Sequence, residues 1–218
     1  MIKAIIFDMD GVISDTERIY GEISEAYLKE HGIIMSARET SLRYAGLTFP
    51  LMFADLFAKH NISYSPEDAT REVMKRSLKA FETDVQPMPG ALALIDALSR
   101  KNFKLGVASG AKLYLIDMIL SRLDLKNKFH TLTSSEEVAR GKPYPYIFLL
   151  TAQRLGVQPE ECVVIEDGLH GMIGAKKAGM KVVALDTHGD LEQTHTDLYT
   201  DLIVQSLEEL NAEAISRL

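Results

Sequence analysis

The fold is decided by the stretch KAIIFDMDGV, residues 3–12 of this 218-residue chain. Its apolar part, residues 3–7, is short and rich in isoleucine, which predicts a strand buried inside a sheet. Asp8, Met9, Asp10 and Gly11 follow at once, and acidic residues with glycine are typical of a turn. We therefore expect a central strand that ends in a tight, acidic turn.

Residues 15–87 have helical patterns and almost no strand signal. Ile19, Tyr20 and Ile23 recur with the spacing of one helix face, and Ser65-Pro66 has the composition of a helix start. We expect this region to be an α-helical cap domain inserted after the first strand. The remaining residues, 1–14 and 88–218, are expected to form the core domain.

Beyond residue 90 the apolar pattern alternates between helices and strands. We expect strands at 104–109, 129–132, 162–166 and 181–185, with helices at 91–101, 112–123, 145–155, 169–178 and 207–215. Alternating units of this length predict an α/β fold, a Rossmann-like doubly wound parallel sheet.

Polar side chains follow three of the predicted strands. Asp8, Ser109 and Asp167 each stand at the end of a buried apolar run, and Lys142 precedes the helix at 145–155. Because the carboxyl ends of parallel strands line one crevice, we expect these four side chains to meet there.

Such a set suits the transfer of a phosphoryl group. The carboxylates of Asp8 and Asp167, with a backbone carbonyl of the Asp10 turn, are oxygen ligands of the kind that Mg²⁺ prefers. Asp8 beside a metal ion and a lysine can attack phosphorus, and Asp10 can protonate the leaving oxygen and later deprotonate water. Lys142, the Ser109 hydroxyl and the Gly110 N–H at a helix start can bind the phosphate oxygens.

These residues resemble the four ordered motifs of the haloacid dehalogenase superfamily, with the helical cap of its β-phosphoglucomutase-like subgroup. The motifs are Asp8-Met9-Asp10-Gly11-Val12, Ser109, Gly141-Lys142-Pro143 and Glu166-Asp167. The resemblance implies that Asp8 is the nucleophile, that Asp10 is the acid and base, and that Ser109 and Lys142 hold phosphate. It also implies an acidic metal site with Asp8, Asp10, Glu166 and Asp167, where Glu166 acts directly or through water.

Within this subgroup the choice lies between a phosphatase and a mutase. β-Phosphoglucomutases carry a histidine where this chain has Tyr20 and an arginine where it has Phe49, so a phosphatase of a small phosphate monoester, a sugar phosphate, is favoured. Arg43 and Gly46 resemble the cap element that contacts substrate in sugar-phosphate phosphatases. Gly110-Ala111 follows Ser109 where relatives often have a second polar residue.

Other interpretations stay open at this point. A β-phosphoglucomutase-type isomerase and a non-catalytic phosphate-binding regulator are the alternative functions. Taken singly, Ser109 is typical of a helix N-cap, Arg43 of an exposed helix residue, and Glu166 of a partner for a neighbouring base.

Composition restricts the partners. The formal net charge of −7 repels nucleic acid and acidic lipid surfaces, and no apolar run reaches the length of about 20 residues that a membrane helix needs. The single cysteine excludes an internal disulfide and favours a cytoplasmic setting. We expect a monomer or weak oligomer that acts on a small phosphorylated metabolite and binds neither nucleic acid nor membrane.

Overall fold

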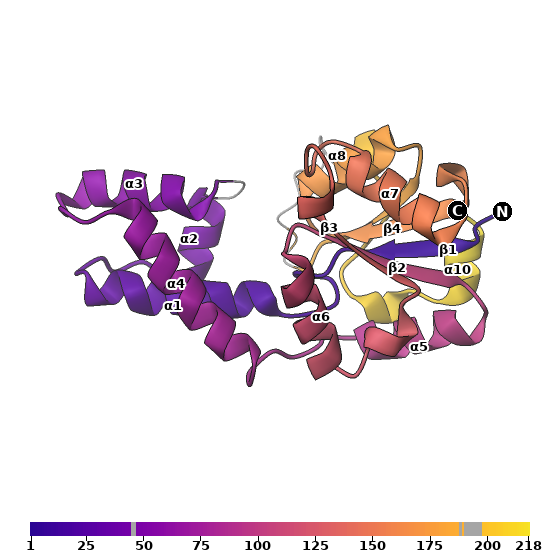
Figure 1. Ribbon diagram of the computed structural model, residues 1–218, viewed down its shortest axis with the longest axis horizontal. Helices are drawn as coiled ribbons and strands as arrows, with labels where there is room; N and C mark the ends of the chain where they lie inside the picture. Colours follow the sequence, from indigo (N-terminus) through magenta and orange to yellow (C-terminus); the bar gives the residue numbers. More distant parts are fainter. Residues whose placement is uncertain (45–46, 188, 190–197) are drawn as a thin grey trace. The chain divides into compact units, whose positions relative to one another are not determined.

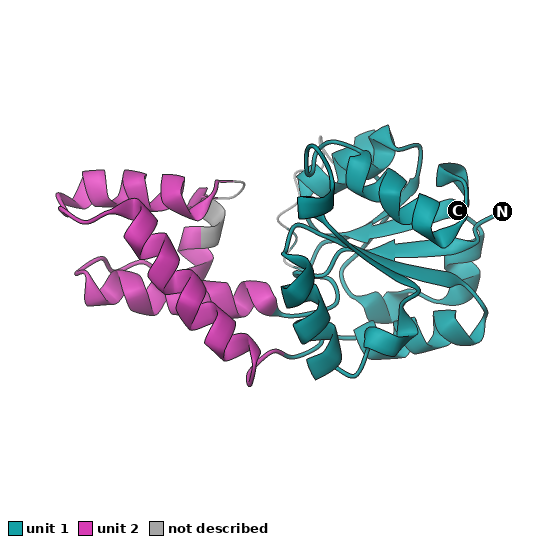
Figure 2. Ribbon diagram, viewed as in Figure 1, with its two compact units in different colours: residues 1–15, 86–218 teal, residues 16–85 magenta. Residues whose placement is uncertain are grey.

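The computed structural model describes residues 1–44, 47–187, 189 and 198–218, with the backbone alone at 41 and 42. Two compact units make up the chain, residues 1–15 with 86–218 and residues 16–85 (Figure 2). Their boundaries differ from the expected ones by one residue at the first junction and by two at the second.

The described residues of the first unit form a six-stranded sheet in which every pair of neighbours is parallel, in the order β3-β2-β1-β4-β5-β6 (Figure 1). This order is doubly wound, because the chain adds strands first on one side of β1 and then on the other. The strands are β1 (Ala4–Phe7), β2 (Lys104–Ser109), β3 (Thr131–Ser134), β4 (Cys162–Glu166), β5 (Lys181–Leu185) and β6 (Leu202–Val204).

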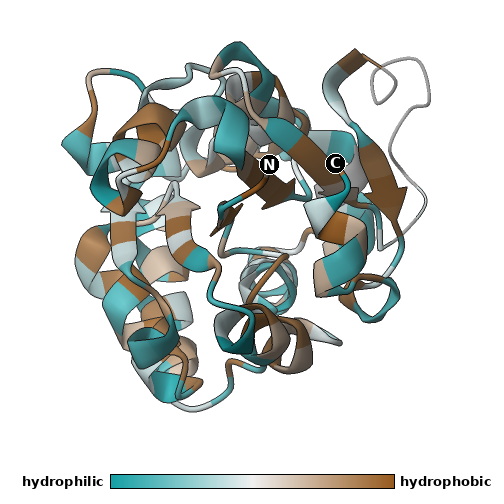
Figure 3. Cartoon of the chain, turned by 90° about the vertical axis from the view of Figure 1, so that its right-hand side faces the viewer, coloured by the Kyte–Doolittle hydropathy of each residue, from teal (hydrophilic) through white to brown (hydrophobic). Residues whose placement is uncertain are grey.

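Helices cover both faces of this sheet, α7 and α8 on one face and α5 and α6 on the other (Figure 1). Strand β1 is therefore buried at all four residues, and the central strands carry the hydrophobic colour in Figure 3. The helices of the unit are α5 (Ala91–Arg100), α6 (Leu113–Arg122), α7 (Tyr146–Leu155), α8 (Leu169–Lys177) and α10 (Ala212–Ser216). Short 3₁₀ turns are η1 (Lys126–Lys128), η2 (Ser135–Glu137), η3 (Pro159–Glu161) and η4 (Leu207–Glu209).

The second unit consists, in its described part, of helices that share an apolar core. The helices are α1 (Thr16–Glu30), α2 (Ala37–Tyr44), α3 (Phe49–His60) and α4 (Pro66–Phe81). Helix α4 starts as its sequence predicts, because the Ser65 hydroxyl accepts a hydrogen bond from the Asp68 N–H and Pro66 occupies the first turn. The fully buried Phe53 and Leu56 of α3 pack in the middle of this unit.

Two sequence-based expectations about the chain's end were wrong. The helix expected at 207–215 is interrupted, because Leu210 is extended and Asn211 begins α10 by accepting hydrogen bonds from the N–H groups of Glu213 and Ala214. Strand β6 was missed, since it is only three residues long and has an exposed Ile203 at its centre. Among the described residues no helix is long and apolar enough to cross a membrane.

Asp201 ties β6 to β5 and α8. Its Oδ2 accepts hydrogen bonds from the Val182 N–H at 2.8 Å and Lys176 Nζ at 2.6 Å, and its Oδ1 accepts one from Lys181 Nζ at 3.1 Å. Burial raises the pKa of Asp201, but the hydrogen bonds from Lys176, Val182 and Lys181 outweigh burial and hold this pKa below its ordinary value.

The substitution Asp201→Asn is expected to lower the free energy of unfolding at pH 7 by about 2 kcal/mol, because hydrogen bonds to a charged group are lost. The pKa of Asp201 is lower in the folded protein than in the unfolded chain, where it is about 4, so the ionised carboxylate stabilises the fold at every pH above about 4. This stabilisation is lost as the pH falls through the pKa of the folded protein. Urea unfolding should therefore show a large difference between variant and wild type at pH 7 and a small one near pH 3. An equal difference at both pH values contradicts this assignment, and Glu160→Gln at an exposed carboxylate is the control.

Candidate active site

The carboxyl ends of β1, β2 and β4 place the predicted residues beside one another. Phe7 pairs with Ile165 of β4 and with Val107 of β2, so Asp8 and Glu166 leave neighbouring strands at the same level. The Asp8 N–H donates a hydrogen bond to the Ile165 carbonyl at 3.0 Å, which fixes the first residue of the acidic turn against β4. This edge is the switch point of the doubly wound sheet, where ligands bind in such folds.

Lys142 lies between two buried carboxylates. Its Nζ is 2.6 Å from Asp8 Oδ1 and 2.6 Å from Glu166 Oε1, and all three side chains are nearly shielded from solvent, with exposed fractions of 14% for Lys142, 9% for Asp8 and 3% for Glu166. The ammonium group also lies 5.5 Å from the centre of the Phe148 ring. The sequence predicted Lys142 as a phosphate-binding residue, and in this structure it contacts the carboxylates.

Asp8, Glu166 and Asp167 form an acidic cluster. Each offers a carboxylate oxygen, and these oxygens lie within 4.8 Å of one another, close enough to bind one metal ion together. Glu166 Oε2 also accepts hydrogen bonds from the N–H groups of Asp167 at 3.0 Å and Gly168 at 3.3 Å. Hard oxygen donors of this kind fit Mg²⁺ or Ca²⁺ better than a softer transition metal.

Electrostatics favour a cation at this cluster. Burial, assisted by Glu166 and by Asp10, raises the pKa of Asp8 to about 8, although Lys142 acts in the opposite direction. Burial lowers the pKa of Lys142, but Asp8 and Glu166 outweigh burial and raise it above its ordinary value. The cluster holds three carboxylates, of which Asp8 and Glu166 contact the Lys142 ammonium group, and a divalent cation beside them would favour their ionised forms.

The remaining core residues lie at the end of β2. The Ser109 hydroxyl donates to Asp10 Oδ2 at 3.3 Å and accepts a hydrogen bond from the Ala111 N–H at 3.0 Å. Ser109 is fully buried, whereas Gly110 is exposed, with no heavy atom within 4 Å of the place where a side chain would begin. The Gly110 backbone is thus open to a ligand. The Asp10 carboxylate accepts the hydrogen bond from Ser109 and lies outside the group of Asp8, Glu166 and Asp167, and the expected role of the Asp10 turn at the metal stays a prediction.

The two residues expected to contact substrate from the helical unit have different outcomes. Arg43 lies at the end of α2, where it is exposed and forms an ion pair of 3.1 Å with Glu39 one turn earlier. Gly46 lies outside the described residues.

Two glycines shape the site by lacking side chains. A methyl group on Gly171 in α8 would overlap Glu166 Oε1, and one on Gly11 would overlap Asp167 Oδ2. Gly11 also has a φ of 74°, which disfavours any residue with a side chain. This role of Gly171 was not expected from the sequence, in which glycine recurs at 168 and 171 around the start of α8.

The geometry agrees with an independent comparison of sequences. A profile of the family described as haloacid dehalogenase-like hydrolase matches residues 5–185. The chain belongs to the haloacid dehalogenase-like hydrolase family. The expected family, its β-phosphoglucomutase-like phosphatase type and the doubly wound fold with helical insertion are therefore confirmed.

Individual relatives cover nearly the whole chain. Hexitol phosphatase B of Escherichia coli is 28% identical over 97% of this chain and 96% of its own length. The β-phosphoglucomutase of Bacillus subtilis is 30% identical over 98% of this chain and 94% of its own. A crystal structure of a haloacid dehalogenase family hydrolase from Deinococcus radiodurans, with bound phosphate and sodium, has a TM-score of 0.86 and 26% identity, covering 99% of this chain and 96% of that one.

The substitution Gly171→Ala is expected to displace the Glu166 carboxylate and break its 2.6 Å contact with Lys142. We expect the free energy of unfolding to fall by about 2 kcal/mol, a typical cost of overpacking, and calorimetric binding of a divalent cation to weaken. Gly168→Ala is the matched control, because its new methyl group would have Glu166 Oε2 at 4.0 Å as its nearest neighbour. Equal effects of the two substitutions would show that Gly171 does not hold the site in shape.

Proposed function

We propose that this chain is a Mg²⁺-dependent phosphatase that hydrolyses a small sugar phosphate through a phosphoryl group carried on Asp8. The observation that carries the proposal is the position of Asp8, inside an acidic cluster and 2.6 Å from the Lys142 ammonium group. The phosphate bound in the Deinococcus radiodurans relative and the name of the hexitol phosphatase support the substrate class.

The metal is assigned to the acidic cluster. Asp8 and Asp167 are the proposed direct ligands, with a backbone carbonyl of the Asp10 turn. Glu166 is proposed to act mainly through its bonds to Lys142 and to two backbone N–H groups, since both of its oxygens have partners. When bound, Mg²⁺ supplies positive charge beside the transferring oxygens and keeps Asp8 ionised.

The reaction then has two steps. An Asp8 oxygen forms a bond to phosphorus while the bond from phosphorus to the sugar oxygen breaks, and Asp10 gives its proton to that leaving oxygen. Asp10 next removes a proton from water, the water oxygen attacks phosphorus, and the Asp8 carboxylate is regenerated with release of inorganic phosphate. Throughout, the Ser109 hydroxyl, the Gly110 N–H and Lys142 stabilise the negative charge of the transferring group.

The substitution Asp8→Asn is expected to lower kcat/KM for p-nitrophenyl phosphate by at least about a thousandfold, because the amide cannot act as the nucleophile. Asp117→Asn, which removes a half-buried carboxylate paired with Lys126, is the matched control and should retain full activity. Mass spectrometry of acid-quenched wild type should show one added phosphoryl group, absent in Asp8→Asn. Activity of the folded Asp8→Asn protein would rule out the proposed nucleophile.

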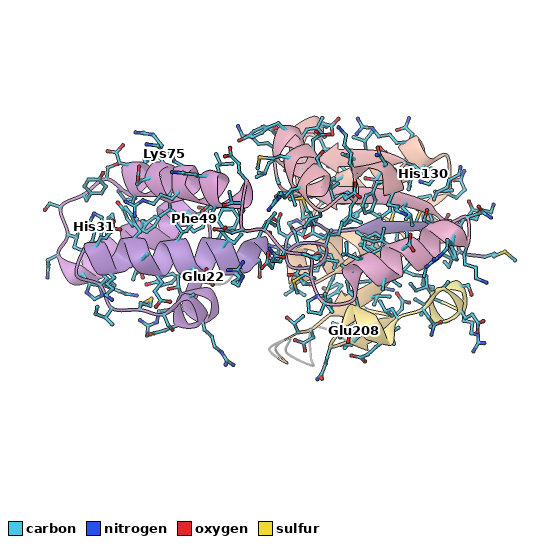
Figure 4. The ribbon with its side chains drawn as sticks, turned by 90° about the horizontal axis from the view of Figure 1, so that it is seen from below. Glu22, His31, Phe49, Lys75, His130 and Glu208 are labelled. Carbon is cyan, nitrogen blue, oxygen red and sulfur yellow. The ribbon has the colours of Figure 1, made fainter. Side chains whose placement is uncertain are left out.

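An isomerase remains the second candidate, because the chain is 30% identical to a β-phosphoglucomutase. The helical unit favours the phosphatase. Tyr20 and Phe49, which stand where the mutases carry a histidine and an arginine, both line a pocket of about 260 Å³ within that unit. The Tyr20 ring lies 5.7 Å from the Phe49 ring, which is labelled in Figure 4, and 5.0 Å from Phe81. These positions therefore offer aromatic surface in place of the imidazole and the guanidinium group.

With β-glucose 1-phosphate and Mg²⁺, we expect release of inorganic phosphate in step with consumption of the ester and no build-up of glucose 6-phosphate. The physical reason is that a hydrolase lets water reach the phosphorylated aspartate, whereas a mutase must exclude it. Free phosphate and glucose 6-phosphate should be measured in the same samples, across a panel that includes hexitol and ketose phosphates. Glucose 6-phosphate as the main product would replace the phosphatase by the isomerase.

A further inference from the structure

The loop that follows β2 receives its support from the end of β3. Ser109 pairs with Ser134 in the parallel register of the two strands, so the first residues beyond each strand run side by side. Ser135 Oγ donates a hydrogen bond to the Gly110 carbonyl at 2.9 Å, and Ser134 Oγ donates one to the Ala111 carbonyl at 2.7 Å. Two successive carbonyls of the loop are thus held by two successive hydroxyls.

Fixing these carbonyls also fixes N–H groups. In a trans peptide the carbonyl and the following N–H point in opposite directions. The bond from Ser135 to the Gly110 carbonyl therefore sets the direction of the Ala111 N–H, which donates to Ser109 Oγ at 3.0 Å. Ser109 Oγ accepts that hydrogen and gives its own to Asp10 at 3.3 Å. Ser135 is thus connected with Asp10, the proposed acid and base, through the Gly110–Ala111 peptide and the Ser109 hydroxyl.

One of the two supporting residues, Ser134, is itself held in place. Ser134 is fully buried; its N–H donates to Glu137 Oε2 at 2.8 Å and its Oγ accepts from the Glu136 N–H at 3.2 Å. Glu137 in turn pairs with Arg154 of α7 at 2.6 Å. A group fixed in this way needs no rearrangement when a ligand arrives, which is the condition for effective charge stabilisation.

Gly110 makes this support necessary. Glycine loses more backbone freedom on ordering than any other residue, and Gly110 is exposed. Loop residues with so few constraints bind an anion weakly, because binding must first order them. We propose that Ser134 and Ser135 are positioning residues that pre-order the Ser109–Ala111 loop for phosphate, an inference that rests on the proposed function.

The test compares Ser135→Ala with Ser135→Thr, which restores the hydroxyl, and with Ser121→Ala, which removes an exposed hydroxyl on α6. Ser135→Ala should lower kcat/KM for p-nitrophenyl phosphate about tenfold, the size of one lost hydrogen bond. It should weaken inhibition by inorganic phosphate by a similar factor and leave the unfolding midpoint unchanged. Ser135→Thr should recover most of both losses, and Ser121→Ala should match the wild type. Ser134→Ala should act in the same direction.

A second comparison separates positioning from general damage. Because Ser135 acts through the Ala111 N–H on Ser109, its removal should cost clearly less than tenfold in a Ser109→Ala background. Unchanged kinetics and phosphate inhibition in Ser135→Ala would overturn the inference, as would an undiminished loss in the Ser109→Ala background. If the wild type itself hydrolyses no ester, the proposed function fails. In that case, calorimetry of inorganic phosphate binding to wild type and Ser135→Ala tests, independently of catalysis, whether Ser135 orders the loop for phosphate.

Discussion

The site depends on the burial of the Asp8 and Glu166 carboxylates around a single Lys142 ammonium group. Moving such charges out of water costs several kcal/mol for each ion, so the arrangement persists only where the backbone leaves the groups no alternative. Parallel pairing of β1 with β4 imposes it, because Phe7 and Ile165 are in register and both strands end in acid. Sheet topology thus creates an excess of negative charge at one edge, and that excess makes the edge a site for cations.

Two glycines allow these charged groups to lie close together. Gly11 and Gly171 supply space where any side chain would displace Asp167 or Glu166, so the carboxylates approach the turn and α8 more closely than packed side chains would permit. The two Glu166 oxygens are then divided between Lys142 and the start of α8. Glu166 consequently joins the loop that carries Lys142 to the end of β4 and the start of α8, and its position determines where the ammonium group faces Asp8.

Strand-end residues could be predicted from the sequence and loop contacts could not. Asp8, Ser109 and Asp167 follow apolar runs, and parallel pairing alone brings such positions to one edge. Lys142 stands in a loop before α7, and its place before that helix predicted that it reaches this edge, but its two carboxylate partners depend on tertiary packing. The three residues of β6 carry too weak a pattern to be recognised, since sheet pairing and Asp201 hold this strand more than its own composition does. Arg43 has the exposed surface position that its residue type favours.

The roles of Ser134 and Ser135 could not be predicted from the sequence, because they too depend on tertiary contacts of a loop. In the loop after β2, the resemblance to related enzymes leads one to expect a second polar side chain beside Ser109, and the chain has Gly110 and Ala111 instead. The side chains of glycine and alanine form no hydrogen bonds that could order a loop. The sequence of the loop alone therefore predicts that it binds an anion weakly. The hydroxyls that compensate come from the next strand, more than twenty residues away along the chain. The loop is therefore ordered by hydroxyl groups at the end of the neighbouring strand and not by its own side chains. The open Gly110 backbone remains accessible to an anion. A loop with a bulky polar residue at that position would be ordered by its own contacts but less accessible.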